Sequence, residues 1–247
     1  MLFQPFDERK PVRIYYTSMP HWRQDNCTYF VTYRLADSIP AGVLREWEFE
    51  KLKWIQGRVK VASIDNRINA DDSIDNRTYR WDELFPLLSD SNKYAFLKCF
   101  NRKLNTYLDS GAGSCTLRNP SCARIVLEGW EFFDGQRYEL GDLVVMPNHV
   151  HVLITPMVGF ELEDILQSRK RQSAREVNQK LSTSGALWQK HSYDHIVRDV
   201  KELLAFQEYV ANNPQKANLQ TDQFLLRPHD WELPTDCVGI RLTIEST

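Results

Sequence analysis

The chain has 247 residues, a formal net charge of −2 and 42% hydrophobic residues, which is typical of a globular protein with an apolar core. No apolar run approaches the roughly 18 residues of a membrane helix, and the N-terminus lacks the basic and apolar regions of a secretory signal. Five cysteines, at positions 27, 99, 115, 122 and 237, include no CxxC pair. We therefore expect neither a disulfide framework nor a zinc ribbon, and a reducing, cytoplasmic location.

Charge is unevenly distributed along the chain. Residues 65–90 hold seven acidic residues against three basic ones, whereas residues 165–190 hold six basic residues against Glu176 alone. A local positive surplus suits contact with a phosphate backbone, although a solvated helix face gives the same pattern. The candidate contacts are Arg169, Lys170, Arg171, Arg175 and, less strongly, Arg34, Arg198 and Lys190.

The first half of the chain predicts one strand and two helices. Residues 1–26 carry three prolines among polar residues and predict an irregular arm. Residues 27–35, CTYFVTYRL, are rich in β-branched and aromatic side chains and predict the first strand. Pro40 opens an amphipathic helix, residues 63–92 predict a polar loop, and Tyr94–Leu108 predicts a second helix. Residues 40–117 are therefore expected to form a helical, partly acidic insertion.

A helix and a hairpin follow the insertion. Asn119-Pro120 is a helix start, with an N-cap before a proline in the first turn, and the helix is predicted to reach Phe133. Two β-rich runs, Tyr138–Met146 and Val150–Thr155, flank a Pro147-Asn148 turn signal and predict a hairpin.

The remaining segments alternate between helix and strand. They are a helix over Leu162–Leu181, a short strand over Tyr193–Arg198, a helix over Val200–Asn213 that is expected to end before Pro214, and a possible strand over Gly239–Ile244 in the tail 215–247. Without the insertion, the order is typical of an α+β, ferredoxin-like (RRM-like) antiparallel sheet with helices packed on it. Many unrelated proteins share that fold, so the order alone does not determine function.

Two pairs of residues suggest a metal site. His149 and His151 lie two apart on a predicted strand, so both side chains project from one face and can act as a pair of metal ligands. Tyr209 and Asn213 are four apart on the last predicted helix and therefore share a face. A phenol and an amide oxygen can thus reach the same ion. Chance spacing of the histidines, a packing role for Tyr209 and a helix-end role for Asn213 are the alternatives.

These residues belong to segments that resemble a known family. MPNHVHVL and YVANNP are similar to the signatures of HUH single-strand nucleases and, more narrowly, of the REP-associated tyrosine transposases. The segments CTYFVTYRLADSIP, LDSGAGSCTLRNPSCARIV, FFDGQRYEL, ALWQKHSYDHIVRD and EYVANNPQKANL follow in the family's order. The resemblance covers about residues 22–219 without about 45–95, and the length and acidity of the insertion depart from the family's pattern. On this basis the catalytic domain is expected over 27–214.

The resemblance implies a metal-dependent endonuclease and strand transferase that acts on hairpin-containing single-stranded DNA through a 5′-phosphotyrosine. It implies Tyr209 as the nucleophile, with His149, His151 and Asn213 holding Mg²⁺ or Mn²⁺. Tyr193 is the rival nucleophile, because its segment also resembles the family. A hairpin with a flanking guide sequence, a nucleoid-associated location, and action as a monomer or homodimer are further implications.

Two further residues lie in segments near the predicted site. Trp188 is a candidate for stacking on a base or for the core, and His195 stays outside the expected catalytic set.

Two other function classes compete with the enzyme. A catalytically inactive hairpin DNA- or RNA-binding protein on the same fold would bind without metal and form no covalent adduct. A structural protein with buried histidines would show no metal dependence.

Overall fold

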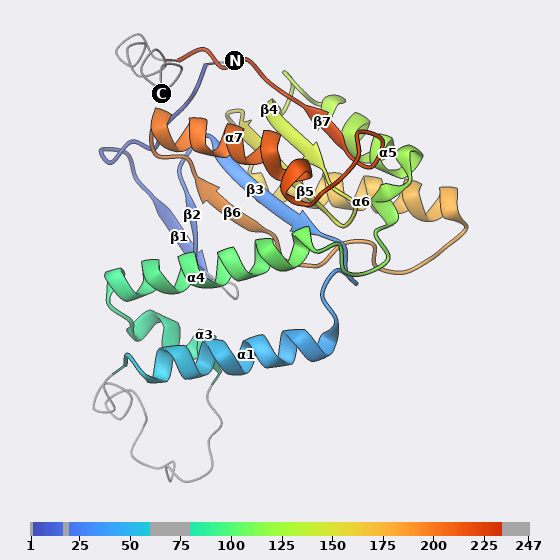
Figure 1. Cartoon of the computed structure of the whole chain (residues 1–247). Helices are drawn as coiled ribbons and strands as arrows, with labels where there is room; N and C mark the ends of the chain where they lie inside the picture. The colour runs from blue at the N-terminus through green and yellow to red at the C-terminus, as the bar shows by residue number, and fades with distance from the viewer. Residues whose placement is uncertain (1, 17–19, 60–79, 234–247) are drawn as a thin grey trace. The chain divides into compact units, whose positions relative to one another are not determined.

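The computed structural model describes residues 2–16, 20–59 and 80–233 (Figure 1). Cys237, the possible strand over Gly239–Ile244 and most of the predicted acidic segment lie outside the described residues. The chain divides into two compact units, Met1–Ser38 with Gly111–Thr247, and Ile39–Ser110. None of the described helices is both long and apolar enough to cross a membrane.

The first unit contains a five-stranded antiparallel sheet in the order β6-β3-β5-β4-β7. The strands are β3 (Tyr29–Arg34), β4 (Tyr138–Val145), β5 (His149–Pro156), β6 (Tyr193–Ile196) and β7 (Leu225–Arg227). The order of the first four is that of a ferredoxin-like sheet, so the predicted α+β fold class is confirmed. β7 was not predicted, and it extends the sheet beyond β4.

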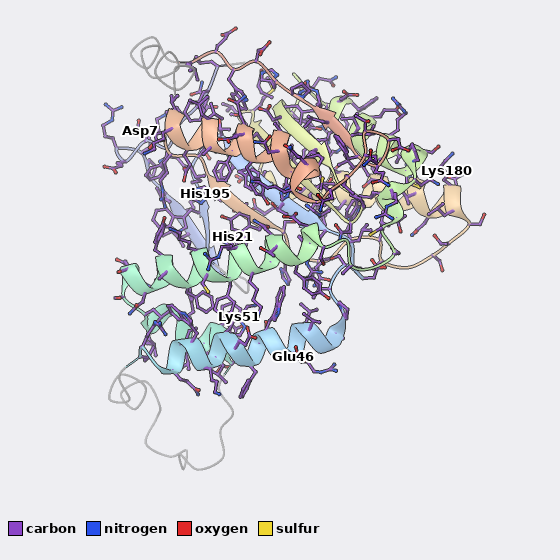
Figure 2. All side chains as sticks on the ribbon, in the orientation of Figure 1. Asp7, His21, Glu46, Lys51, Lys180 and His195 are labelled. Atoms are coloured by element: carbon purple, nitrogen blue, oxygen red, sulfur yellow. The ribbon has the colours of Figure 1, made fainter. Side chains whose placement is uncertain are left out.

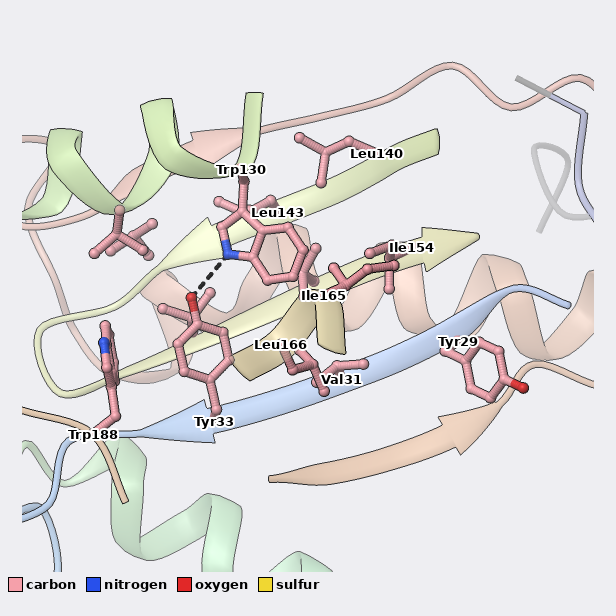
Figure 3. Packing of buried hydrophobic residues seen from close by; sticks show 14 of the residues in the cluster. Tyr29, Val31, Tyr33, Trp130, Leu140, Leu143, Ile154, Ile165, Leu166 and Trp188 are labelled. Atoms are coloured by element: carbon pink, nitrogen blue, oxygen red, sulfur yellow. Dashed lines mark hydrogen bonds between the residues drawn. The ribbon is translucent and has the colours of Figure 1, made fainter. Parts of the chain in front are cut away.

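Helices cover both faces of this sheet, because apolar side chains occupy alternate positions on both sides of β3. Val31 and Tyr33 pack with α5 (Pro120–Glu131) and α6 (Leu162–Leu181). Figure 3 shows this core, in which the Trp130 indole donates a hydrogen bond to the Tyr33 hydroxyl over 2.8 Å. Phe30 faces the other way and packs with α7 (Val200–Lys216). α7 therefore lies across the sheet from α5 and α6 (Figure 1).

The helix starts follow the predicted capping chemistry. The Asn119 side chain accepts a hydrogen bond from the Ser121 backbone N–H over 3.0 Å, with Pro120 in the first turn of α5. α6 has the predicted bounds. α7, however, continues to Lys216 instead of ending at Asn213. Pro214 is buried inside this helix, and we attribute the extra turn to its packing, which outweighs the backbone hydrogen bond that proline cannot donate.

The irregular arm predicted over residues 1–26 contains a hairpin that was not predicted. Residues Arg13–Tyr16 (β1) and Pro20–Arg23 (β2) pair as a second, two-stranded antiparallel sheet. Pro20 is the first residue of its strand, a position that tolerates proline. His21, labelled in Figure 2, joins β2 to β6, because its Nδ1 lies 2.6 Å from an Asp194 carboxylate oxygen.

A buried arginine strengthens this attachment. The Arg23 guanidinium donates to Asp194 over 2.5 Å and to Glu163 over 2.6 Å. Although burial opposes the charged form, the hydrogen bonds from His21 and Arg23 hold the pKa of Asp194 below its ordinary value. The N-terminal hairpin is thus attached to the main sheet by a network of buried charges.

The second unit consists of helices: α1 (Ala41–Gln56), α3 (Trp81–Leu84), the 3₁₀ turn η1 (Phe85–Leu87) and α4 (Asp90–Asp109). The polar loop predicted over 63–92 is therefore helical in part of its described portion, and the predicted second helix begins earlier than expected. Rings of Trp81, Phe85 and Phe96 pack on one another with centroids 5.2 to 6.3 Å apart. This aromatic packing explains why the described residues Trp81–Leu87 form helical turns.

A bulge in β4 connects α7 to the segment that follows β7. The pairing of β4 with β5 is irregular between Leu140 and Leu143, and Asp142 within this bulge is buried. Its carboxylate accepts hydrogen bonds from the Trp231 indole over 2.7 Å and from the Gln207 amide over 3.2 Å. Gln207 lies on α7, so these bonds fix that helix over the sheet.

Candidate metal and nucleophile site

His149 and His151 lie on the same face of β5, as predicted. They face Arg34 and Thr32 of β3 in the antiparallel register, and this is the face that α7 covers. Both histidines are buried, and their Nε2 atoms lie 3.0 Å apart. The two ring nitrogens therefore converge on one point beneath α7.

A hydrogen bond from the neighbouring residue fixes the orientation of His149. The Asn148 amide nitrogen donates to the Ala112 carbonyl over 3.0 Å, so the Asn148 amide oxygen faces His149 Nδ1, which lies 2.7 Å away. Because that oxygen can only accept, Nδ1 carries the proton of the neutral ring. The Nε2 lone pair of His149 consequently points toward His151, where a cation could bind.

A threonine hydroxyl fixes His151 in the same way. Thr32 Oγ1 lies 2.7 Å from His151 Nδ1. A hydroxyl can donate or accept, so Thr32 is compatible with both neutral tautomers of His151. When Thr32 donates to Nδ1, His151 donates from Nε2 to His149. When Thr32 accepts from Nδ1, the Nε2 lone pair of His151 is available to a cation. Such partners orient metal-bound histidines and tune their affinity.

Burial keeps both imidazoles uncharged. Burial lowers the pKa of His149 from 6.5 to about 3, with a smaller opposing contribution from its interaction with Asn213. Burial and the neighbouring His149 also hold the pKa of His151 well below 6.5. Neutral imidazole is the form that binds metals, so the pair needs to lose no proton before it accepts a cation.

Asn213 provides the third polar group. It is buried on α7, and neither atom of its side-chain amide has a hydrogen-bond partner within the described residues. Leaving a buried amide unpaired costs roughly 1–3 kcal/mol, which a cation bound to the amide oxygen would recover. No group of three or more His, Cys, Asp or Glu side chains that could hold a metal occurs in the described ranges. The donor set that fits an ion is thus two imidazoles and this amide.

Tyr209 lies beside the histidines, one helical turn before Asn213. Its hydroxyl is 3.5 Å from His151 Nε2, and its ring meets the rings of His151 and Phe30 edge to face, with centroids 5.0 and 5.8 Å apart. The Lys216 ammonium lies 5.2 Å from the centroid of the Tyr209 ring. The phenol and the histidines come from the same chain.

The rival tyrosine and its neighbour lie further along the sheet. Tyr193 pairs with Thr32 from β6, and its ring lies 6.5 Å from that of Phe30. His195, labelled in Figure 2, is also on β6, and its Nε2 is 2.8 Å from a Glu202 carboxylate oxygen at the start of α7. Although burial opposes the charged form, the hydrogen bond with His195 holds the pKa of Glu202 below its ordinary value. His195 thus pairs with the first turn of α7.

The predicted DNA contacts on α6 lie on the opposite face of the sheet from the histidines. Arg169 is buried there, donates to the Gly129 carbonyl, and lies over the Phe133 ring. Lys170 donates to the Gln189 and Lys190 carbonyls over 2.5 and 3.0 Å. These two side chains therefore serve packing within the protein.

The other candidates differ in exposure. Arg171, Arg175, Lys190 and Arg198 are exposed, and Arg34 is half-buried. Trp188 belongs to the core, because it is buried and its indole donates to Ser173 over 3.0 Å.

Two residues of the site were not among the predicted ones. Thr32 orients His151, but only the register of β3 against β5 reveals this. Asn148 was interpreted as a turn residue, although its position directly before His149 was a signal that it could contact that ring.

Comparisons with known proteins add to this geometry. Residues 129–213 match the family described as "Transposase IS200 like", and this range holds both histidines, Tyr209 and Asn213. The chain is similar to a solved structure described as "Structure of the REP associates tyrosine transposase bound to a REP hairpin", with 14% identity, 80% of this chain and 74% of that chain covered, and a TM-score of 0.37. No curated protein matches the chain. Residues 129–213 of the chain are therefore similar to the IS200-like transposases.

Proposed function

We propose that this protein is a metal-dependent single-stranded DNA endonuclease and strand transferase that forms a 5′-phosphotyrosine through Tyr209. The observation that carries the proposal is the position of the Tyr209 hydroxyl, 3.5 Å from His151 Nε2, in a site where His149 and Asn213 also converge. A nucleophile directly beside a set of metal donors is the arrangement that phosphodiester cleavage requires.

The residues that would hold the ion are His149, His151 and Asn213. Two imidazoles and an amide oxygen form an open donor set that leaves room for phosphate oxygens, which suits exchangeable Mg²⁺ or Mn²⁺ better than a closed zinc site. A bound divalent ion would polarise the phosphoryl oxygens and stabilise phenolate-like charge on the nucleophile.

The chain's own side chains position the reaction. Phe30 and His151 hold the Tyr209 ring between the sheet and α7. In the proposed step a bond forms between the Tyr209 oxygen and phosphorus, and the bond from phosphorus to the 3′ oxygen breaks. Overall, the phenol loses a proton and the departing oxygen gains one as a 3′-OH. Because the phosphotyrosine conserves the bond energy, a second 3′-OH can reverse the step and join strands.

The substrate proposed is single-stranded DNA with a hairpin and a flanking guide sequence, as the resemblance of the segments around His149 and Tyr209 implies. The proposed contacts to the DNA phosphate backbone are three exposed basic side chains, Arg171 and Arg175 on α6 and Arg198 before α7. Such contacts set affinity more than sequence choice. Since the nucleophile and metal donors belong to one chain, we propose that a monomer completes cleavage in cis.

A single assay tests this function. Labelled hairpin oligonucleotides are incubated with the protein and Mn²⁺, and denaturing gels reveal any covalent adduct. We expect an adduct that chelator prevents, that Tyr209→Phe abolishes without loss of DNA binding, and that Tyr193→Phe leaves unchanged. Binding that persists in chelator with no adduct from the wild type would instead indicate a catalytically inactive hairpin-binding protein. An adduct lost in Tyr193→Phe and kept in Tyr209→Phe would reassign the nucleophile.

A further inference from the structure

Arg34 is a cation on the face of the sheet that carries the histidines. It is the last residue of β3 and lies opposite His149 in the register of β3 against β5. Side chains directly opposite in an antiparallel pair have Cβ atoms about 5 Å apart. Arg34 therefore projects beside His149, on the side of the sheet where Tyr209 lies.

The Arg34 guanidinium is held in place by a buried hydroxyl. Its Nη1 donates to Ser38 Oγ over 3.0 Å, and Ser38 in turn donates to the Leu35 carbonyl over 2.8 Å. Ser38 is fully buried. The Leu35 backbone N–H donates to the Asn148 carbonyl over 2.8 Å, which ties this assembly to the residue that orients His149. The Ser38 bond uses one of five guanidinium N–H groups.

The charge of the half-buried Arg34 lacks the carboxylate partners that the buried Arg23 has. Arg23 has two carboxylate partners, Asp194 and Glu163. Burial lowers the pKa of Arg34 to about 10, with no acidic side chain of the described residues offsetting it. The Arg34 charge is felt by another base, Lys170 of α6, because burial together with Arg34 lowers the pKa of Lys170 to about 8. Burying a charge is costly unless it is paired, so an anion from outside the chain would stabilise the half-buried Arg34 guanidinium.

We propose that Arg34 is a further catalytic residue, whose guanidinium contacts the non-bridging oxygens of the phosphate that Tyr209 attacks. This inference rests on the proposed function. A guanidinium matches two phosphate oxygens at once, and a cation preorganised by Ser38 stabilises the charge that gathers on those oxygens during in-line displacement. Arg34 would thus act on the rate of cleavage more than on the affinity for DNA.

The test separates rate from affinity with matched variants. Single-turnover cleavage is measured at saturating Mn²⁺ and hairpin DNA, and affinity for uncleaved DNA is measured in a Tyr209→Phe background. We expect Arg34→Gln to slow cleavage by roughly 100- to 1,000-fold while the Kd for DNA changes less than about threefold. Arg34→Lys should recover part of the rate. Arg124→Gln, at an exposed position of α5 on the opposite face of the sheet, should cleave like the wild type.

A direct probe of contact completes the test. Replacing one non-bridging oxygen of the scissile phosphate by sulfur should slow the wild type more than Arg34→Gln, because the variant has already lost the contact. A folded Arg34→Gln that cleaves at the wild-type rate, or one that loses only affinity, would overturn the proposal. If Arg34→Gln melts below the wild type, the same assay is carried out with Arg34→Lys. A wild-type cleavage rate together with a wild-type sulfur effect in Arg34→Lys would count against contact of Arg34 with two phosphate oxygens. Failure of the proposed function is distinguishable, since the wild type would then form no Tyr209-dependent adduct.

Discussion

The Asn213 side chain should lower the stability of the metal-free protein and should be necessary for metal binding. Replacing it should therefore raise the melting temperature of the metal-free protein and weaken Mn²⁺ binding. Its side chain is 0% exposed, and both amide atoms lack a hydrogen-bond partner among the described residues. Such an amide costs roughly 1–3 kcal/mol, and Asn213→Leu removes that cost at similar volume. At about 2–4 °C per kcal/mol for a chain of this size, the metal-free variant should melt several degrees above the wild type.

Saturating Mn²⁺ should reverse the order of the two melting temperatures. A ligand at about 100 times its Kd stabilises a protein by roughly 2.7 kcal/mol, and the wild type should gain that increment from Mn²⁺ while Asn213→Leu gains little of it. Thermal melts in chelator and in saturating Mn²⁺ measure both quantities. Asn212→Leu, the same change one residue earlier on α7, is the matched control and should keep the Mn²⁺ increment.

Two results would refute this reasoning. One is a metal-free Asn213→Leu protein that melts well below the wild type, which would mean that the amide is satisfied in the folded protein. The other is an Mn²⁺ increment equal to that of the wild type, which would remove Asn213 from the donor set.

Three further predictions concern the surroundings of the site. Thr32→Val should weaken Mn²⁺ binding roughly 10- to 100-fold in calorimetric titrations, whereas Thr28→Val, which also removes a buried threonine hydrogen bond, should leave it unchanged; equal effects would argue against orientation of the histidine. Because the pKa of Asp194 is held below its ordinary value of 3.8, its contribution to stability is present above about pH 4 and is lost as pH falls through the folded value. Asp194→Asn should therefore lower the free energy of unfolding at pH 7, measured by urea titration, by about 3–5 kcal/mol. The variant should also lose less stability than the wild type on acidification to pH 3, and parallel curves of stability against pH for the two proteins would refute this. A Cβ at Gly141 would overlap the Trp231 ring, so Gly141→Ala should displace that ring and increase its exposure to fluorescence quenchers, and unchanged quenching would contradict the contact.

The sequence was most informative where a local pattern determines structure. Alternation placed His149 and His151 on one face, and helical spacing placed Tyr209 and Asn213 together, and both arrangements are confirmed. The cap at Asn119 and the bounds of α6 also follow from neighbouring residues alone. Each of these depends on a period or a cap that a few consecutive residues define.

Features that depend on distant pairing could not be predicted. Thr32 meets His151 only because β3 and β5 adopt one register, and a shift of one residue would bring a side chain of the other face to that position. The hairpin near the N-terminus depends on Arg23 meeting Asp194 across the fold, which its local sequence does not reveal. Pro214 was expected to end α7, but it is buried within the helix. Arg169 was predicted to contact DNA, and its position between helices follows from packing that charge counts do not capture.

We propose Tyr209 as the nucleophile beside the paired histidines. The most direct test is to trap the adduct formed with a hairpin oligonucleotide and Mn²⁺, digest it with trypsin, and locate the attached nucleotide by mass spectrometry. Trypsin separates the two tyrosines into different peptides, Glu202–Lys216 and His191–Arg198. We predict that the nucleotide is attached to the peptide that contains Tyr209. Attachment to the peptide that contains Tyr193, or to neither, would contradict the account.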